Sequence, residues 1–306
     1  MQYIFGPVPS RRLGFSLGID LVPFKTCSLD CPYCQLGKTT HKTVRRRAYG
    51  SPEDIILELR DALQQHQKID YIAIGGSGEP TLSTHLGGLL SSVKEMTSIP
   101  VAVLTNGTLL HREQVRNELL AADLVIPSLD AVSEDVFVRI NRPHPQLTVS
   151  RMIAGLKRFR EVFPGKLWLE IMLVRGVNDS PEEIGKMKSV IASIAFDKVQ
   201  LNTPVRPSPD RTLTPLTEQE LTDLKGFLGE PCEVIAEFTG KQYVREKAMQ
   251  ERMITMISRH PLNLADLSSS LGVPQAELIK LICCLEDQGR IESRQHGDEY
   301  YYHLKR

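Results

Sequence analysis

Three cysteines in one short stretch constrain this chain more than any other feature. Cys27, Cys31 and Cys34 form a C-x3-C-x2-C run, with Tyr33 directly before the third cysteine. Three thiolates from one loop can bind three irons of a [4Fe-4S] cube, whereas a cluster used only for electron transfer normally takes four. The fourth iron is then open to another ligand. The run therefore predicts an iron–sulfur loop with one open coordination position.

A zinc site is the main alternative for this loop. His41 follows Cys34 by seven positions, and zinc sites built from three cysteines and one histidine exist. The cysteine run alone leaves both metals open.

A glycine-rich stretch follows about forty residues after the cysteines. A short apolar strand expected at 71–74 leads into the sequence Gly-Gly-Ser-Gly-Glu-Pro at 75–80. Glycine allows a backbone to approach a ligand closely and to take positive φ. Such a turn alone is usually structural, but the zinc hypothesis does not account for its place one strand after the cysteines.

At these two motifs the sequence resembles the radical S-adenosylmethionine (radical SAM) superfamily. The resemblance implies that Cys27, Cys31 and Cys34 bind a [4Fe-4S] cluster whose open iron chelates S-adenosylmethionine. It implies that an electron from the reduced cluster cleaves this cofactor to a 5′-deoxyadenosyl radical. It also implies that the cofactor is contacted by the aromatic residue of the loop and by the glycine-rich turn, which gives as cofactor-binding residues Tyr33, Gly76, Ser77, Gly78 and Glu79.

The chain from the first to the sixth expected strand alternates strands and helices, as in repeated βα units. Strands are expected to start at about 17, 71, 101, 124, 167 and 198, and the residues before 17 read as a loop. Helices are expected from 51 and at about 83–96, 111–121, 148–163 and 181–195. The fold class predicted with the resemblance is α/β, a partial TIM-like (β/α)6 barrel followed by a small α+β winged-helix domain.

Polar residues close most of these strands, and in barrels of this type the carboxyl ends of the strands build the site. The resemblance implies that Ser128 and Asp130 contact the ribose and methionyl parts of the cofactor. Further cofactor-binding candidates are Thr105, Asn106, Glu170 and Asn202, of which Glu170 lies within its strand. The alternative for these four residues is a structural role, in which the polar side chain at a strand end forms hydrogen bonds within the protein.

Arginines recur in the loops after the later strands, at 139, 142, 175, 206 and 211. Prolines next to some of them stiffen the chain, and arginine binds phosphate or carboxylate in a forked geometry. We therefore select Arg142, Arg206 and Arg211 as candidates for binding an anionic substrate. Ordinary surface arginines remain the alternative.

The segment 38–47 contains five basic residues and no acid. A solvated surface is one interpretation. The others are a docking site for an acidic, low-potential electron donor such as flavodoxin or ferredoxin, or contact with an anionic substrate.

The stretches 128–131 and 140–143 also look similar to the enzyme that builds the tricyclic base of wybutosine in transfer RNA. That enzyme uses further N-terminal cysteines for a second cluster, whereas no cysteine precedes Cys27 here. The likeness therefore implies the fold and the cofactor but not the substrate.

The last sixty residues read as a separate unit, which divides the chain into a barrel at 1–244 and a second domain at 245–306. Three short helices and a hairpin are expected, with a turn at 272–274, and this order resembles a winged helix-turn-helix domain. The segment 247–306 carries eight Lys or Arg and eight Asp or Glu. Since phosphate neutralisation dominates nucleic-acid affinity, we predict that this tail binds protein or peptide, or forms a dimer, rather than binding DNA.

The remaining sequence signals predict a cytoplasmic location without a membrane partner. No apolar run is long enough to span a bilayer, and the first residues do not form a secretory signal. Six cysteines, three of them in the ligand-like run, do not indicate a disulfide framework.

The function predicted from these signals is that of a radical SAM enzyme, an oxidoreductase or transferase of unknown subclass. Its substrate is expected to be anionic and to be RNA, a peptide or a small molecule. One alternative is an iron–sulfur regulator that senses redox state or S-adenosylmethionine and signals through its winged helix. Another is an activase for a glycyl-radical enzyme.

Overall fold

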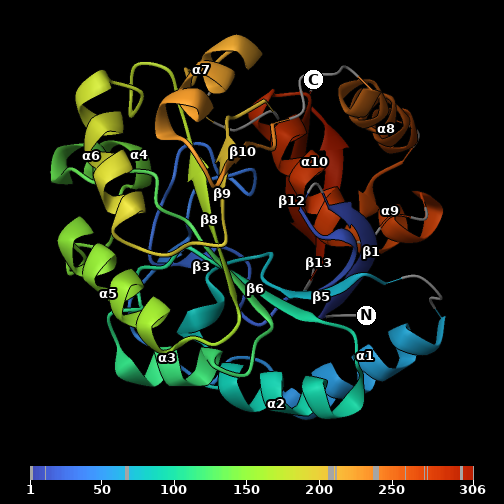
Figure 1. Ribbon diagram of the computed structural model, residues 1–306. Helices are drawn as coiled ribbons and strands as arrows, with labels where there is room; N and C mark the ends of the chain where they lie inside the picture. Colours follow the sequence, from blue (N-terminus) through green and yellow to red (C-terminus); the bar gives the residue numbers. More distant parts are fainter. Residues whose placement is uncertain are drawn as a thin grey trace.

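The computed structural model describes residues 3–10, 12–65, 69–205, 210, 212–236, 241–258, 260–271, 273, 275–296 and 299–305 (Figure 1). Its centre is an eight-stranded sheet in the order β1-β2-β5-β6-β7-β8-β9-β10. All neighbouring pairs from β2 to β10 are parallel, and β1 is antiparallel to β2. The strands are β1 (Ile4–Ser10), β2 (Gly14–Ile19), β5 (Tyr71–Ile74), β6 (Val101–Thr105), β7 (Leu124–Pro127), β8 (Lys166–Met172), β9 (Lys198–Asn202) and β10 (Cys232–Val234).

The six predicted strands are confirmed as parallel neighbours, and the sheet has one further strand at each end. The N-terminal addition corrects the sequence prediction, because β1 occupies part of the segment expected to be a loop, and β2 begins at Gly14 rather than near 17. Pro7 and Pro9 hid β1, but an edge strand tolerates proline because one side of its backbone needs no partner. Its pairing with β2 shifts register between Phe5 and Val8.

Helices cover the outer face of this sheet (Figure 1). They begin where the capping signals place them: Ser51 Oγ accepts from Asp54 N at 3.3 Å before the first helix, and Ser180 caps the helix that starts at Pro181. The helices of the barrel are α1 (Pro52–Gln65), the 3₁₀ turn η1 (Pro80–Leu82), α2 (Leu86–Met96), α3 (Glu113–Leu119), α4 (Glu134–Asn141), α5 (Val149–Val162), α6 (Pro181–Ala192) and α7 (Glu218–Leu228). Among them α4 and α7 were not predicted.

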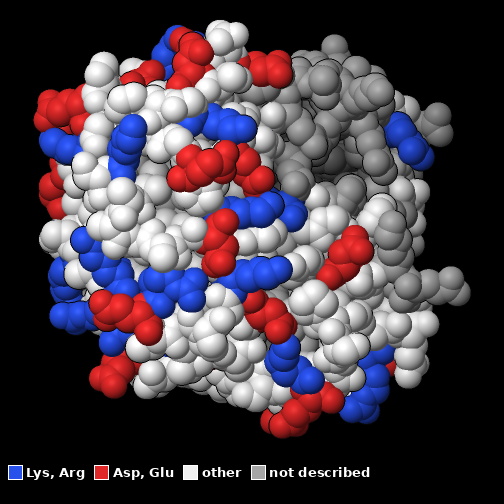
Figure 2. Space-filling model, viewed as in Figure 1, with Lys and Arg blue, Asp and Glu red and all other residues white. Residues whose placement is uncertain are grey.

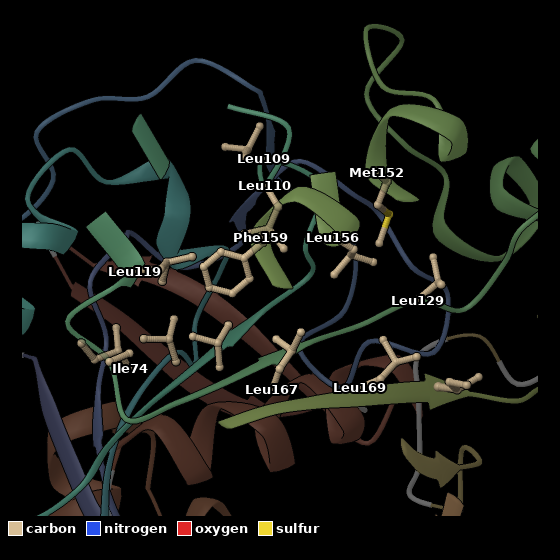
Figure 3. Close-up of a cluster of buried hydrophobic side chains, with 14 of the residues drawn as sticks. Ile74, Leu109, Leu110, Leu119, Leu129, Met152, Leu156, Phe159, Leu167 and Leu169 are labelled. Carbon is tan, nitrogen blue, oxygen red and sulfur yellow. The ribbon is translucent and has the colours of Figure 1, made fainter. Parts of the chain in front are cut away.

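The main apolar core lies between the sheet and these helices. Figure 3 shows outward side chains of the strands, with Leu167 below Leu156 and Phe159 of α5 and Ile74 next to Leu119 of α3. Phe159 also stacks on Phe163, with ring centroids 4.7 Å apart. Full burial of such a side chain stabilises the fold by about 1.5–3 kcal/mol.

A second apolar cluster lies on the inner face of the sheet. Alternate residues of β5, β6 and β7 join Leu13 and Trp168 there, namely Tyr71, Ala73, Ala102, Leu104, Leu124 and Ile126. The Arg12 side chain, from the turn between β1 and β2, forms an ion pair with Glu170 of β8. Because β5, β6 and β7 separate β2 from β8 in the sheet, this pair crosses its concave side. The described sheet is therefore a partial barrel, open between β1 and β10.

Two smaller units complete the chain. The cysteine-bearing loop contains the parallel pair β3 (Thr26–Cys27) and β4 (His41–Lys42). The tail has its own apolar cluster and a three-stranded sheet, β11-β13-β12. Its elements are α8 (Lys241–Ile257), β11 (Leu262–Asn263), α9 (Leu264–Leu271), α10 (Gln275–Asp287), β12 (Ile291–His296) and β13 (Glu299–Leu304).

The tail thus contains the expected three helices and hairpin. Its assignment as a winged helix-turn-helix domain, and the boundary at 244/245, remain predictions. Within the expected turn, Gly272 and Pro274 lie outside the described residues, as do Gly297 and Asp298 between the hairpin strands. Among the described residues, no helix is both long and apolar enough to cross a membrane.

Candidate active site

The cysteine loop follows β2 and is fixed by hydrogen bonds to three other parts of the barrel. Lys25 N donates to Ser77 O at 2.7 Å, and Glu79 N donates to Thr26 O at 3.0 Å, which joins the loop to the glycine-rich turn. Asp30 N donates to Asn141 O at 2.9 Å at the end of α4. Ser28 Oγ lies 2.7 Å from Thr108 Oγ1 after β6. The cysteines are therefore held at the carboxyl ends of the strands.

Each of the three sulfurs accepts a hydrogen bond from a different side chain. Asn106 Nδ2 lies 3.4 Å from Cys27 Sγ, and Asn141 Nδ2 lies 3.3 Å from Cys31 Sγ. Lys25 Nζ lies 3.3 Å from Cys34 Sγ. Nitrogen donors of this kind stabilise charge on thiolate sulfur. The donor set therefore suits three metal-bound thiolates.

Burial makes these thiols poor acids without a metal. It raises the pKa of Cys27 to about 12, with the Glu79 carboxylate adding to the effect. It also raises the pKa of Cys31, with Asp130 adding to the effect. Both thiols therefore hold their protons at neutral pH unless a metal cation replaces them.

The geometry does not favour the zinc alternative. Among the described residues, no group of three or more His, Cys, Asp or Glu side chains converges on a single ion. His41, the proposed fourth zinc ligand, is exposed in β4. A cube distributes its thiolates over separate irons, so it does not need that convergence.

The glycine-rich turn packs against the cysteine loop so closely that side chains are excluded. A Cβ at Gly78 would lie 2.2 Å from Thr26 O, and one at Gly76 would lie 2.3 Å from Asp20 Oδ1. Ser77 donates to Asp20 twice, from its backbone nitrogen at 2.7 Å and its hydroxyl at 2.8 Å. The glycines are therefore required for the approach of two chain segments.

The Glu79 carboxylate accepts four hydrogen bonds from other residues of the protein. It accepts from Thr81 N at 3.0 Å, Thr81 Oγ1 at 2.6 Å, Thr105 Oγ1 at 2.6 Å and Asn106 N at 2.7 Å. Burial nevertheless raises its pKa. These bonds join the glycine-rich turn to the end of β6 and orient Asn106 toward Cys27.

Asp130 connects the cysteine loop to the far side of the barrel. Its carboxylate accepts from the Tyr33 hydroxyl, from Asn141 Nδ2 at 2.7 Å and from Met172 N at 2.9 Å. Burial raises the pKa of Asp130 to about 6, although these three donors oppose the shift. Burial, followed by the Asp130 charge, raises the pKa of Tyr33 as well.

The raised pKa of Asp130 predicts a pH dependence of the apo protein. The folded-state pKa of about 6 exceeds the ordinary value of 3.8, so this group's stabilisation is complete below pH 3.8 and is lost as the pH rises through 6. Asp130→Asn should therefore reduce the fall in unfolding free energy across this interval, measured by urea denaturation at several pH values. An unchanged slope would contradict the assignment. The absolute stability is a poorer readout, because the new amide NH₂ faces hydrogen-bond donors.

Two further candidates, Glu170 and Asn202, lie on the inner face of the sheet. Asn202 Nδ2 donates to Glu170 Oε1 at 3.0 Å, and the same oxygen accepts from Arg12 Nη2. Ser128 forms a backbone bridge with Glu170. Glu170 is also close enough for its charge to raise the pKa of Asp130. These residues therefore border the Asp130 cluster.

Of the three arginines expected to bind substrate, the structure describes Arg142. Arg142 ends α4 in a left-handed conformation, with φ 44°, and its half-exposed side chain pairs with Asp210 at 3.3 Å. Arg206 and Arg211 lie outside the described residues. Arg175 pairs with Glu220, and Arg139 pairs with Asp135.

The basic segment after the cysteines divides into one structural residue and an exposed remainder. Arg46 donates to Thr81 O at 2.8 Å and Ser83 O at 2.6 Å and pairs with Glu118. The exposed basic side chains are Lys38, Lys42, Arg45 and Arg47. A surface hollow of about 650 Å³ between α2 and α3, lined partly by Glu118, contains none of the predicted site residues.

Comparison with known families agrees with this geometry. The family model described as the Radical SAM superfamily matches residues 21–187, more than half of the chain. The chain belongs to the radical SAM superfamily. This radical SAM protein is also 35% identical over 309 residues to the UPF0026 protein of Methanocaldococcus jannaschii, covering 99% of this chain and 96% of that protein.

A second relative is much longer. A Brachyspira hyodysenteriae protein named GTPase Obg is 38% identical over 292 residues, which cover 94% of this chain but only 43% of that protein. The radical SAM protein thus spans less than half of this relative's length.

Solved structures share the fold. A radical SAM methyltransferase from Sphaerobacter thermophilus superposes with a TM-score of 0.53 at 17% identity, covering 73% of this chain and 67% of that one. The enzyme anSMEcpe with bound S-adenosylmethionine gives a TM-score of 0.53 at 17% identity, covering 70% and 58%. The predicted barrel class is thereby confirmed. The superfamily uses a [4Fe-4S] cluster and S-adenosylmethionine, and this radical SAM protein is an enzyme of that class.

Sequence reasoning missed several residues that organise the site. Lys25 directly precedes the motif, and its left-handed backbone with φ 56° gives no signal in a non-glycine residue. Asn141 lies in the 140–143 stretch but was not selected. Arg12 lies in a segment expected to be an irregular loop. Asp20 and Gln200 looked like ordinary strand residues.

Proposed function

We propose that this chain is a radical SAM enzyme whose cluster is held by Cys27, Cys31 and Cys34. The supporting observation is that three free thiols from one loop each accept a different nitrogen donor at the carboxyl ends of the parallel strands. When bound, the reduced cluster supplies the electron that cleaves S-adenosylmethionine to a 5′-deoxyadenosyl radical, which abstracts hydrogen from a substrate.

The chain's own residues orient the cofactor. Asp130 holds the Tyr33 hydroxyl, which fixes the ring next to Cys34 as one wall of the adenine site. Ser128 and Asp130 would hold the ribose, and the turn at Gly76, Ser77 and Gly78 would hold the methionyl amine. The side chain of Glu79 contributes by holding Thr105 and Asn106. The apolar inner face of β5 to β7 excludes water from the reacting atoms.

The exposed basic side chains of the cysteine loop support a docking site for an acidic electron donor. Lys42, Arg45 and Arg47 surround the loop's return strand and are exposed. Flavodoxin or ferredoxin has the required low potential and negative surface. Elsewhere, on the face seen in Figure 2, basic and acidic side chains alternate among the coloured residues.

The zero net charge and the mixed charges of the face seen in Figure 2 favour a small molecule or peptide over RNA as the substrate. The tail, with balanced charges, remains a proposed protein- or peptide-binding unit.

The test is cofactor cleavage by the reconstituted protein. After anaerobic loading with iron and sulfide, dithionite and S-adenosylmethionine should yield 5′-deoxyadenosine, measured by chromatography. Cys27→Ala should abolish the product and lower the bound iron. Cys232→Ala is the matched control, because Cys232 is a buried thiol in β10, outside the cysteine loop. A wild-type protein with a full cluster and no product would contradict the enzyme and favour the sensing regulator.

A further inference from the structure

The inner face of the partial barrel has two chemically different halves. The inward residues of β5, β6 and β7 are apolar. On β8 and β9 the inward residues include Glu170, Gln200 and Asn202, and the last two are 1% and 2% exposed. Side chains this polar are costly to bury without partners. Packing alone therefore does not explain why these polar side chains are buried.

The Arg12 side chain reaches this polar half, where its ion pair with Glu170 uses only one of its nitrogen atoms. Its Nη2 donates to Glu170 Oε1, but its Nε is buried and has no hydrogen-bond partner. Nε and Nη2 share one edge of the guanidinium, the edge that binds both oxygens of a carboxylate in a forked pair. Glu170 uses only half of that edge. The second donor of that edge has no acceptor.

A complementary unmet group lies on the strand next to Glu170. Gln200 is the register partner of Glu170 across β8 and β9. Its Nε2 donates to Glu233 at 2.8 Å, which leaves its Oε1 buried without a donor. Leaving a buried polar atom unsatisfied costs about 1–3 kcal/mol. The same small region thus contains an unmet donor on a cation and an unmet acceptor next to an anion.

We infer that Arg12, Glu170 and Gln200 bind the α-amino carboxylate head group of an amino-acid substrate. The carboxylate accepts from the Nε edge of Arg12, and the ammonium donates to Gln200 Oε1 and to Glu170. A phosphate or simple carboxylate satisfies only the arginine, and an amine satisfies only the acceptors. The zwitterion satisfies both and keeps the region neutral.

The position suits hydrogen abstraction, and this inference rests on the proposed function. Ser128 bridges Glu170, and Asp130 lies within reach of the Glu170 charge. A head group held here leaves the amino-acid side chain facing either the cofactor residues or the apolar half. The site therefore selects the substrate class without taking part in bond cleavage.

The test is calorimetric binding of free amino acids to the reconstituted protein without reductant. The probes are the proteinogenic L-amino acids, followed by the decarboxylated amine and the deaminated acid of any that bind. At least one amino acid should bind, and both truncated analogues should bind at least about tenfold more weakly. Arg12→Met should weaken binding of the amino acid by a similar factor. Gln200→Leu should weaken binding of the amino acid but not binding of its deaminated acid.

Arg139→Met is the matched control, because Arg139 is an exposed arginine on α4. It should bind like the wild type. If Arg12→Met does not fold by circular dichroism, Arg12→Lys keeps the charge without the fork and should still weaken binding several-fold. No binding by any amino acid, or wild-type affinity in both Arg12 variants, would overturn the inference.

Two further arms identify the source of the head group. S-adenosylmethionine carries this group itself, whereas 5′-methylthioadenosine lacks it. One result would assign the site to the cofactor: only S-adenosylmethionine binds, and Arg12→Met weakens binding of S-adenosylmethionine but not of 5′-methylthioadenosine. That result would overturn the inference of an amino-acid substrate. Iron content and 5′-deoxyadenosine report separately on the proposed function. If a protein that assembles no cluster still binds an amino acid, the inferred head-group site is supported and the proposed radical SAM function is contradicted.

Discussion

Gly78→Ala is expected to prevent the cluster from being loaded. The added Cβ would lie 2.2 Å from Thr26 O and 2.7 Å from Val22 Cγ2, so the glycine-rich turn and the cysteine loop would have to separate. Thr26 O is also the acceptor for Glu79 N. Overpacking of this kind costs about 1–3 kcal/mol, and here the backbone that moves carries Cys27. Iron and sulfide per chain after reconstitution are the measurement.

Gly88→Ala is the control for this substitution. Gly88 lies in α2, and a Cβ there meets nothing within 4 Å. Alanine at that position should stabilise the helix slightly, by up to about 1 kcal/mol, and leave iron content unchanged. Normal cluster loading in Gly78→Ala would show that the loop can shift without losing its metal geometry.

Lys25→Met is expected to make the cluster harder to reduce. Lys25 is 3% exposed, and its Nζ donates to Cys34 Sγ at 3.3 Å. Reduction adds negative charge to the cluster, and a neighbouring cation stabilises that charge. A hydrogen bond to a charged group is worth about 1.5–3 kcal/mol, which for one electron corresponds to roughly 60–130 mV. Only the difference in the bond's strength between the two redox states shifts the midpoint potential, so the potential should become more negative by at most about that amount.

Redox titration followed by electron paramagnetic resonance measures this shift independently of turnover. Lys38→Met removes the same charge from an exposed position four residues after Cys34 and should change the potential little. Equal shifts in the two variants would mean that Lys25 acts only through general charge, not through its contact with Cys34.

The sequence predicted the parts of the fold that depend on local pattern. The six parallel strands were visible because β-branched and apolar runs such as 101–104 alternate with helices whose starts carry capping signals at Ser51 and Ser180. The strand β1 was missed because the prolines that hide it are tolerated only at a sheet edge. An edge position is a property of the assembled sheet and cannot be read from the segment.

The site residues follow the same rule: local motifs could be predicted, and contacts between distant segments could not. The three cysteines and the glycine-rich turn were recognisable because their spacing lies within single loops. Contacts between distant segments were harder to find, because Asn141 reaches Cys31 across 110 positions and Arg12 reaches Glu170 across 158. The contact of Glu79 with the cofactor stays a prediction, and its four hydrogen bonds to Thr81, Thr105 and Asn106 could not be read from the motif.

The contacts between the cysteine loop and the end of α4 also constrain the order of events during synthesis. Asp30 N and His144 N bond across these two segments, and Asn141 reaches Cys31 as well. A nascent chain that ends before residue 144 contains all three cysteines but lacks these anchors. We therefore expect the finished loop to form only after the first four parallel strands have been synthesised, and metal loading to follow folding of the N-terminal half.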